Sequence, residues 1–128
     1  MLRRKDSGSF LEKIVKSIKH GLNGINYAIE KENNYLILMV ISVLILVGGF
    51  LLDITIVELA VIILSMGVSF GFEMVNSSIE ALADAVTLDK NRLIKISKDC
   101  ATSALLVSMF VEAVVVGLIY IPKIMDLF

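Results

Sequence analysis

An uncharged, apolar stretch of the sequence runs from Tyr35 to Leu52 and reads YLILMVISVLILVGGFLL. Its 18 residues are dense in Leu, Ile and Val. As a helix, such a stretch is long enough to cross a hydrocarbon core of about 30 Å with its interfacial ends. The stretch therefore predicts a transmembrane helix at about residues 35–52.

Two more apolar runs predict two more spans. The run at residues 59–72 has only 14 residues, but it continues into a polar segment, so a helix over about 55–84 can cross with a polar end. The third run covers about residues 100–121, where Glu112 is the one charged residue, and Pro122 marks its expected end. Glu112 receives no functional role at this point. The pattern predicts an all-α membrane protein with three transmembrane helices.

The composition agrees with a membrane protein and excludes other classes. The chain has 128 residues, which fits a single domain over 1–128, and it is 57% hydrophobic with a mean hydropathy of +0.87. A net charge of −1 gives no basic field for nucleic acid, and the single Cys100 excludes an intrachain disulfide. No apolar segment directly follows the basic N-terminal residues, so we expect no cleavable signal peptide.

The distribution of Lys and Arg predicts the orientation of the spans. Residues 1–34 hold seven, residues 85–99 hold four, and residues 53–58 hold none. Short loops rich in Lys and Arg stay in the cytoplasm. We therefore expect the N-terminus and the 85–99 segment in the cytoplasm of a bacterial cell, with the 53–58 turn and the C-terminus outside.

The segment before the first span has an amphipathic pattern. Its apolar residues recur at spacings of three and four, and three lysines lie off that line: Phe10, Ile14, Ile18, Leu22, Ile25 and Ile29, against Lys13, Lys16 and Lys19. This pattern predicts a helix over about 9–32 that lies in the membrane interface. The alternative is a core helix of a soluble subdomain, but about thirty residues offer too little else to pack against.

Five polar residues on the second span share one helix face: Glu73, Asn76, Ser77, Glu80 and Asp84. An ionised carboxylate in or near the apolar layer is costly unless it is paired or hydrated. This face must therefore point at protein, at cations or at a wet cleft.

Further polar residues are expected at the same cytoplasmic level: Lys95, Lys98 and Asp99 before the third span, and Glu30, Glu32, Asn33 and Asn34 before the first. Carboxylates, amides and lysines together suit a divalent cation with an anionic ligand, because Mg²⁺ takes one or two carboxylates plus phosphate oxygens and water. The alternative is that these acids and lysines merely pair with each other. The sequence has no GxxxxGK[ST] or GxGxxG loop, so any use of ATP would need a different nucleotide site.

Four segments occur together along the chain: residues 17–24 (SIKHGLNG), 32–34 (ENN), 73–84 (EMVNSSIEALAD) and 98–106 (KDCATSALL). In their order and spacing they resemble motifs of the small bacterial diacylglycerol kinase/undecaprenol kinase family. The resemblance implies a homotrimer whose protomers each have three spans and an amphipathic surface helix. It also implies active sites at the cytoplasmic interface, shared between neighbouring subunits. There the γ-phosphate of ATP–Mg²⁺ would pass to the primary hydroxyl of a membrane lipid.

The resemblance also implies roles for individual residues. Glu73 would be the general base and contact the acceptor, and Lys13 falls where the family commonly has an Arg that touches substrate. The metal ligands would be Glu32 and Glu80. The implied contacts to ATP are His20, near the base or ribose, and Glu32, Asn76, Glu80, Lys98 and Asp99.

One segment of the sequence bears on which lipid alcohol accepts the phosphate. Residues 93–99 (LIKISKD) resemble the Gram-positive form of the motif, whose members mostly phosphorylate undecaprenol, so undecaprenol is slightly favoured over diacylglycerol. Either product would feed phospholipid or cell-envelope lipid-carrier metabolism. One rival is a non-enzymatic assembly subunit whose polar face only joins helices. The other is a small ion-translocating subunit, for which Glu112 is the one carboxylate near mid-membrane.

Overall fold

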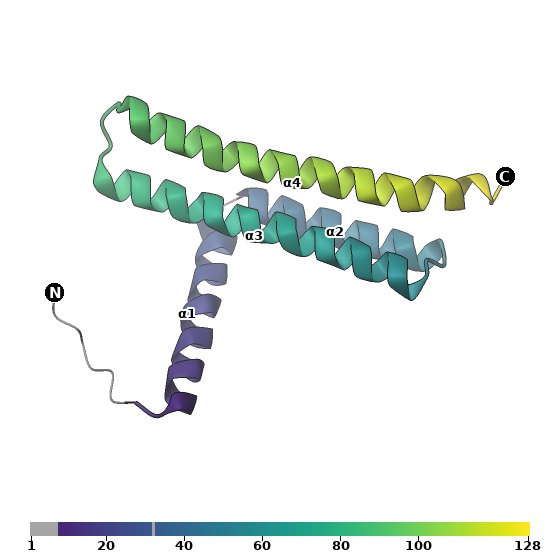
Figure 1. The fold of residues 1–128 in the computed structure, drawn as a ribbon, viewed down its shortest axis with the longest axis horizontal. Helices are drawn as coiled ribbons and strands as arrows, with labels where there is room; N and C mark the ends of the chain where they lie inside the picture. Colours follow the sequence, from purple (N-terminus) through teal and green to yellow (C-terminus); the bar gives the residue numbers. More distant parts are fainter. Residues whose placement is uncertain (1–7, 32) are drawn as a thin grey trace.

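The computed structural model describes residues 8–31 and 33–128, and over these residues the chain is helical and contains no strand. Its helices are α1 (Phe10–Lys31), α2 (Asn33–Leu51), α3 (Ile56–Val86) and α4 (Arg92–Met125). Helices α2, α3 and α4 lie side by side in an elongated bundle, and α1 projects from the side of that bundle (Figure 1). The prediction of an all-α fold is confirmed.

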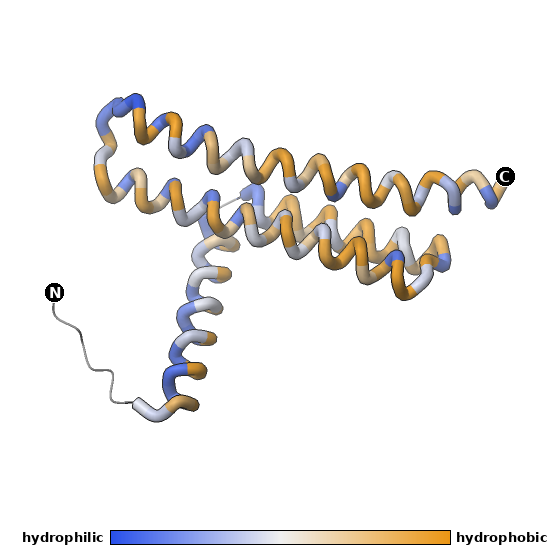
Figure 2. Tube along the Cα trace, viewed as in Figure 1, coloured by the Kyte–Doolittle hydropathy of each residue, from blue (hydrophilic) through white to orange (hydrophobic). Residues whose placement is uncertain are grey.

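Helices α2, α3 and α4 are each long and apolar enough to cross a membrane. Figure 2 shows apolar residues along most of their length and hydrophilic residues at the turns. Large apolar side chains remain on the outside of the bundle, as with Phe50 and Phe110, which are 85% and 69% exposed. A surface of this kind suits hydrocarbon rather than water. The structure thus has three helices that can span a membrane, in the three regions that the sequence predicted.

The turn between α2 and α3 is closed by a capping box at Thr55. The Thr55 hydroxyl oxygen accepts a hydrogen bond from the Glu58 N–H (3.3 Å), and the Glu58 carboxylate accepts one from the Thr55 N–H (2.6 Å). Lys123 of α4 reaches the same place, where its ammonium lies 3.3 Å from the Glu58 carboxylate and donates to the Asp53 carbonyl (3.2 Å). These contacts fix the C-terminal part of α4 at what we call the turn end of the bundle.

The capping box gives a test of local stability. Thr55→Ala removes a side-chain acceptor for the first turn of α3, so we expect a loss of about 1 kcal/mol in the free energy of unfolding. Thr55→Ser keeps that acceptor and should unfold close to the wild type. Unfolding by sodium dodecyl sulfate in mixed micelles, followed by circular dichroism, measures both. Equal stability of the Ala variant and the wild type would show that the cap adds nothing.

Helix α4 is longer at both ends than the predicted span. It begins at Arg92, because the Asn91 side chain accepts hydrogen bonds from the backbone N–H groups of Leu93 (2.9 Å) and Ile94 (3.3 Å). The prediction that Pro122 ends the helix is wrong, since α4 continues to Met125. Pro122 lies in the last turn, where the missing N–H removes one helical hydrogen bond, and its carbonyl still accepts from the Asp126 N–H (3.0 Å).

Helix α1 meets the bundle only through its C-terminal part. Ala28 is fully buried there, and a Cβ added at Gly24 would lie 3.6 Å from the terminal methyl of Met74 on α3. The N-terminal part of α1 exposes both its apolar residues and its lysines, for example Phe10 and Lys13. A helix is therefore present at Phe10–Lys31, and its role as an amphipathic helix in the membrane interface remains a prediction.

Candidate active site

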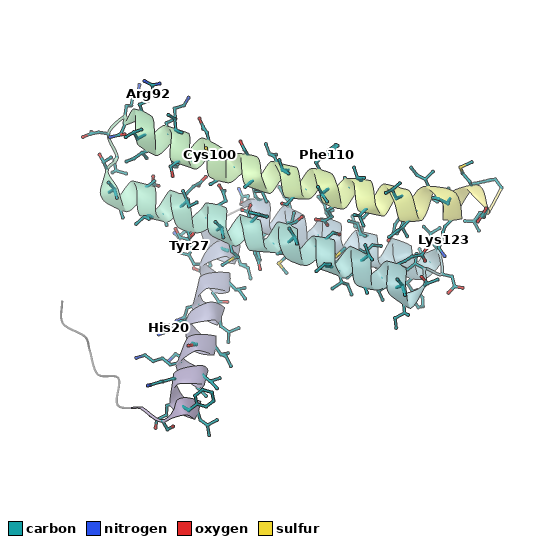
Figure 3. The ribbon with its side chains drawn as sticks, in the orientation of Figure 1. His20, Tyr27, Arg92, Cys100, Phe110 and Lys123 are labelled. Atoms are coloured by element: carbon teal, nitrogen blue, oxygen red, sulfur yellow. The ribbon has the colours of Figure 1, made fainter. Side chains whose placement is uncertain are left out.

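Helices α3 and α4 run antiparallel and are joined by contacts at both ends. At the turn end these are the contacts of Lys123 with Glu58, and at the other end the Lys98 ammonium lies 3.0 Å from an Asp84 carboxylate oxygen. We call this second region, beside the α3–α4 connection, the loop end. Figure 3 shows Arg92 and Cys100 toward the loop end of α4 and Lys123 at the turn end.

The polar residues predicted on one face of α3 do share a face, and most of it is buried. Glu73, Asn76 and Ser77 are 1%, 4% and 3% exposed, Glu80 is half-buried, and Asp84 is exposed near the end of the helix. Exposure thus rises toward the loop end. The face points at neighbouring helices near Glu73 and opens to the outside near Asp84.

Lys98 is the cation that meets this face from α4. Its ion pair with Asp84 holds the ammonium beside the α3 face, and the Glu80 carboxylate adds a weaker attraction to the same charge. The sequence predicted that Lys98 would lie at the same level as these acids, and its contact with Asp84 agrees with that prediction. Asp84 itself was assigned no role in the site.

Thr102 is a further site residue that the sequence did not identify. Its hydroxyl lies 3.4 Å from the side-chain oxygen of Asn76 and donates to the backbone carbonyl of Lys98 (3.1 Å). It therefore links two residues proposed to contact the nucleotide. Thr102 follows Lys98 by four residues, which puts the two on one side of a helix, and this spacing is the signal that could have found it.

Asp99 has a different environment from its neighbour Lys98. Its carboxylate lies 3.7 Å from the Lys95 ammonium one turn earlier, and both side chains are largely exposed. Ion pairs of this kind contribute little to stability. Within one chain, Lys95 and Asp99 therefore fit the alternative interpretation, in which the acids and lysines merely pair with each other.

The structure does not bring the predicted residues of α1 to the α3 face. His20 and Lys13 are both exposed, and Figure 3 places His20 part-way along α1, away from the bundle. Glu32, predicted to bind the metal and ATP, lies outside the described residues. One chain therefore carries Glu73, Asn76 and Glu80 on one face of α3 and brings Lys98 to the loop end of that face, and it leaves Lys13 and His20 apart from them.

A metal site built by the protein alone is absent from residues 8–31 and 33–128, where no three His, Cys, Asp or Glu side chains come together. The donor set that Mg²⁺ usually takes is one or two carboxylates completed by phosphate oxygens and water. The half-buried Glu80 is a carboxylate of the required kind.

Comparison with known proteins identifies the family. Residues 19–120 match the family described as prokaryotic diacylglycerol kinase. The chain belongs to this family. The matched range includes the α3 face, Lys98 and Thr102, so the polar cluster lies within the shared part of the chain.

Three relatives agree with this assignment. The undecaprenol kinase of Bacillus subtilis is 31% identical over 119 residues, which cover 93% of this chain and 97% of that protein. The diacylglycerol kinase of Synechocystis is 26% identical over 97% of this chain and 71% of its own length. The diacylglycerol kinase of Pseudomonas aeruginosa is 31% identical over 81% of this chain and 85% of its own.

Family membership decides between the classes of function. The protein is a lipid kinase, and its family implies ATP as donor together with a divalent metal. The assignment argues against a non-enzymatic assembly subunit and against an ion-translocating subunit.

Proposed function

We propose that this lipid kinase transfers the γ-phosphate of ATP to the primary hydroxyl of a membrane lipid alcohol, with undecaprenol favoured slightly over diacylglycerol. The observation that carries the proposal is the polar face of α3, with Glu73, Asn76 and Glu80, which Lys98 of α4 meets at its loop end. Phosphoryl transfer needs positioned groups and neutralised charge more than covalent chemistry, and this arrangement offers both.

Each residue has a proposed role in this reaction. Glu73 takes the proton of the acceptor hydroxyl, because it is the buried carboxylate on the membrane side of the cluster. Asn76 and Lys98 contact the nucleotide or its phosphates, and Lys98 offsets charge on the transferred group. Asp99 is a further proposed nucleotide contact.

The residues proposed to hold Mg²⁺ are Glu80 and Glu32. When bound, the ion would supply positive charge that lowers the repulsion between the phosphates and the attacking oxygen. Glu80 fits this role because it lies on the same face of α3 as Glu73 and acts on the charge of Lys98.

The proposed orientation puts the loop end of the bundle in the cytoplasm. Support comes from the basic residues, which gather in residues 1–34 and 85–99 and are absent from residues 53–58. In this orientation the cluster meets cytoplasmic ATP, and the turn end with the C-terminus lies outside the cell membrane.

We further propose a homotrimer whose active sites are shared between neighbouring subunits. Within one chain, α1 carries Lys13 and His20 away from Glu73. In a shared site, α1 of one subunit can serve the cluster of another, with Lys13 at the acceptor and His20 at the nucleotide. The surface helix and the three spans then act as one domain over residues 1–128.

Transfer of labelled γ-phosphate from ATP and Mg²⁺ to lipid tests the proposed function. The purified protein is given undecaprenol or diacylglycerol in mixed micelles, with a chelator as control. We expect labelled lipid from both alcohols, more from undecaprenol, and none with the chelator. A higher kcat/KM for diacylglycerol would reverse the proposed preference. Absence of labelled lipid with either alcohol, from protein of native helicity, would contradict the proposed function.

A further inference from the structure

A second buried carboxyl group lies inside the apolar part of the bundle, apart from the residues proposed for catalysis. Glu112 of α4 is only 5% exposed. Among the described residues, no hydrogen bond or ion pair joins its carboxyl group to another group. Ionisable groups at this depth are rare, and they mark candidate functional sites by default.

The contacts at the two ends of the bundle fix the depth of Glu112. At the turn end, Lys123 of α4 pairs with Glu58 of α3. Counting eleven residues from each of them toward the middle of the bundle reaches Glu112 on α4 and Ser69 on α3. At the loop end, Lys98 of α4 pairs with Asp84 of α3. Counting fourteen residues from each of them toward the middle reaches Glu112 and the residue beside Ser69. Glu112 therefore lies level with Ser69, whose fully buried hydroxyl has no partner among the described residues.

The same count relates Glu112 to the proposed catalytic base. Glu73 follows Ser69 by four residues, so its level is about 6 Å nearer the loop end. Ser108 precedes Glu112 by four residues and comes level with Glu73. The register of α3 and α4 thus puts Glu112 about one helical turn from Glu73 along the bundle. Buried polar groups thus continue from Glu73 toward mid-membrane.

Glu112 also lines a groove of about 430 Å³ between α2 and α4. It supplies the one ionisable side chain of the groove, whose other walls are apolar; among them are Leu38, Ile41 and Ile45 of α2 and Met109, Val116 and Gly117 of α4. An apolar groove with a single polar group suits a mainly hydrocarbon molecule with one hydrogen-bonding group.

We propose that Glu112 and this groove form a holding site for the lipid alcohol, where the carboxyl group hydrogen-bonds the acceptor hydroxyl before it moves to Glu73. The inference rests on the proposed function. A charged head group stays at the membrane surface, but the hydroxyl of an uncharged lipid alcohol can lie at the depth of Glu112. A hydroxyl both donates and accepts, so it satisfies a carboxyl group, and the chain of the lipid fills the apolar walls.

Kinetics with the full-length enzyme test the holding site. Glu112→Leu is expected to raise KM for the lipid alcohol about tenfold, the effect of one lost hydrogen bond, with kcat and KM for ATP unchanged. Glu112→Gln keeps a donor and an acceptor and should restore KM. The control is Phe110→Leu, since Phe110 is exposed and points away from the bundle (Figure 3). An unchanged KM in Glu112→Leu, or a loss confined to kcat, would overturn the proposal.

A binding measurement keeps this proposal separate from the proposed function. In a Glu73→Gln background without ATP, the membrane-soluble reagent dicyclohexylcarbodiimide adds to the Glu112 carboxyl group to form an acylurea, located by peptide mass. We expect excess undecaprenol or diacylglycerol to slow this labelling several-fold, and an alkane of similar length to leave it unchanged. Equal labelling with and without lipid alcohol would refute the holding site even in an active kinase. Protection in this background, combined with no phosphorylation of either lipid by the protein that keeps Glu73, would refute the kinase proposal and keep the site.

Discussion

Replacing Glu73 by Gln is expected to lower kcat for lipid phosphorylation about a thousandfold, which is within the usual contribution of a general base. The amide keeps the size of the side chain and cannot take a proton from the acceptor hydroxyl. Glu73 is buried within the bundle, and a glutamine of the same size should leave the packing around it nearly unchanged. KM for ATP should change little, because the proposed nucleotide contacts lie nearer the loop end. The labelled-phosphate assay with saturating lipid alcohol measures both constants.

A matched control for this variant lies on the same helix. Glu58→Gln removes a carboxylate at the turn end, where it pairs with Lys123 and caps α3, and a glutamine can still accept in the capping box. We expect kcat near the wild-type value for this control. A Glu73→Gln protein that keeps more than about a tenth of kcat would exclude Glu73 as the general base.

The spans could be predicted from the sequence because their signal is local. Uncharged runs and their length decide whether a helix can cross a membrane, and α2 and α3 end close to the expected residues. The start of α4 was not predicted, because Arg92 and the lysines after it are charged and their helix lies beyond the apolar run. The side chain of Asn91 sets that start, and such a cap stands out only once a helix is assumed to follow.

The candidate site was predictable only in part. The polar face of α3 follows from helical periodicity, so Glu73, Asn76 and Glu80 were found together. The pairing of Lys98 with Asp84 depends on the register between two antiparallel helices, which spacing along one chain does not give. The same register placed Glu112 near the level of Glu73.

Removing the charge of Lys98 should have the second large effect. Lys98→Met keeps most of the side-chain volume and leaves negative charge on the phosphates without its partner, so we expect kcat/KM for ATP to fall about a hundred- to a thousandfold. Asp84→Asn keeps the cation but loses the 3.0 Å ion pair that positions it, and a fall of about tenfold is expected. Initial rates at varied ATP and saturating lipid alcohol measure these losses.

The order of these effects separates the role of Lys98 in catalysis from a general effect of charge near the membrane. Lys95→Met removes the same charge three residues earlier on α4, where the side chain is 80% exposed and pairs only loosely with Asp99 at 3.7 Å. We expect less than about a threefold change for that control, as for other exposed ion pairs. If Lys95→Met and Lys98→Met lose activity equally, the loss comes from surface charge, and Lys98 does not contact the phosphates. If Asp84→Asn alone matches the wild type while Lys98→Met is inactive, Lys98 contacts the phosphates without needing Asp84 to hold it. The expected graded series requires both the cation and the ion pair that places it against the α3 face.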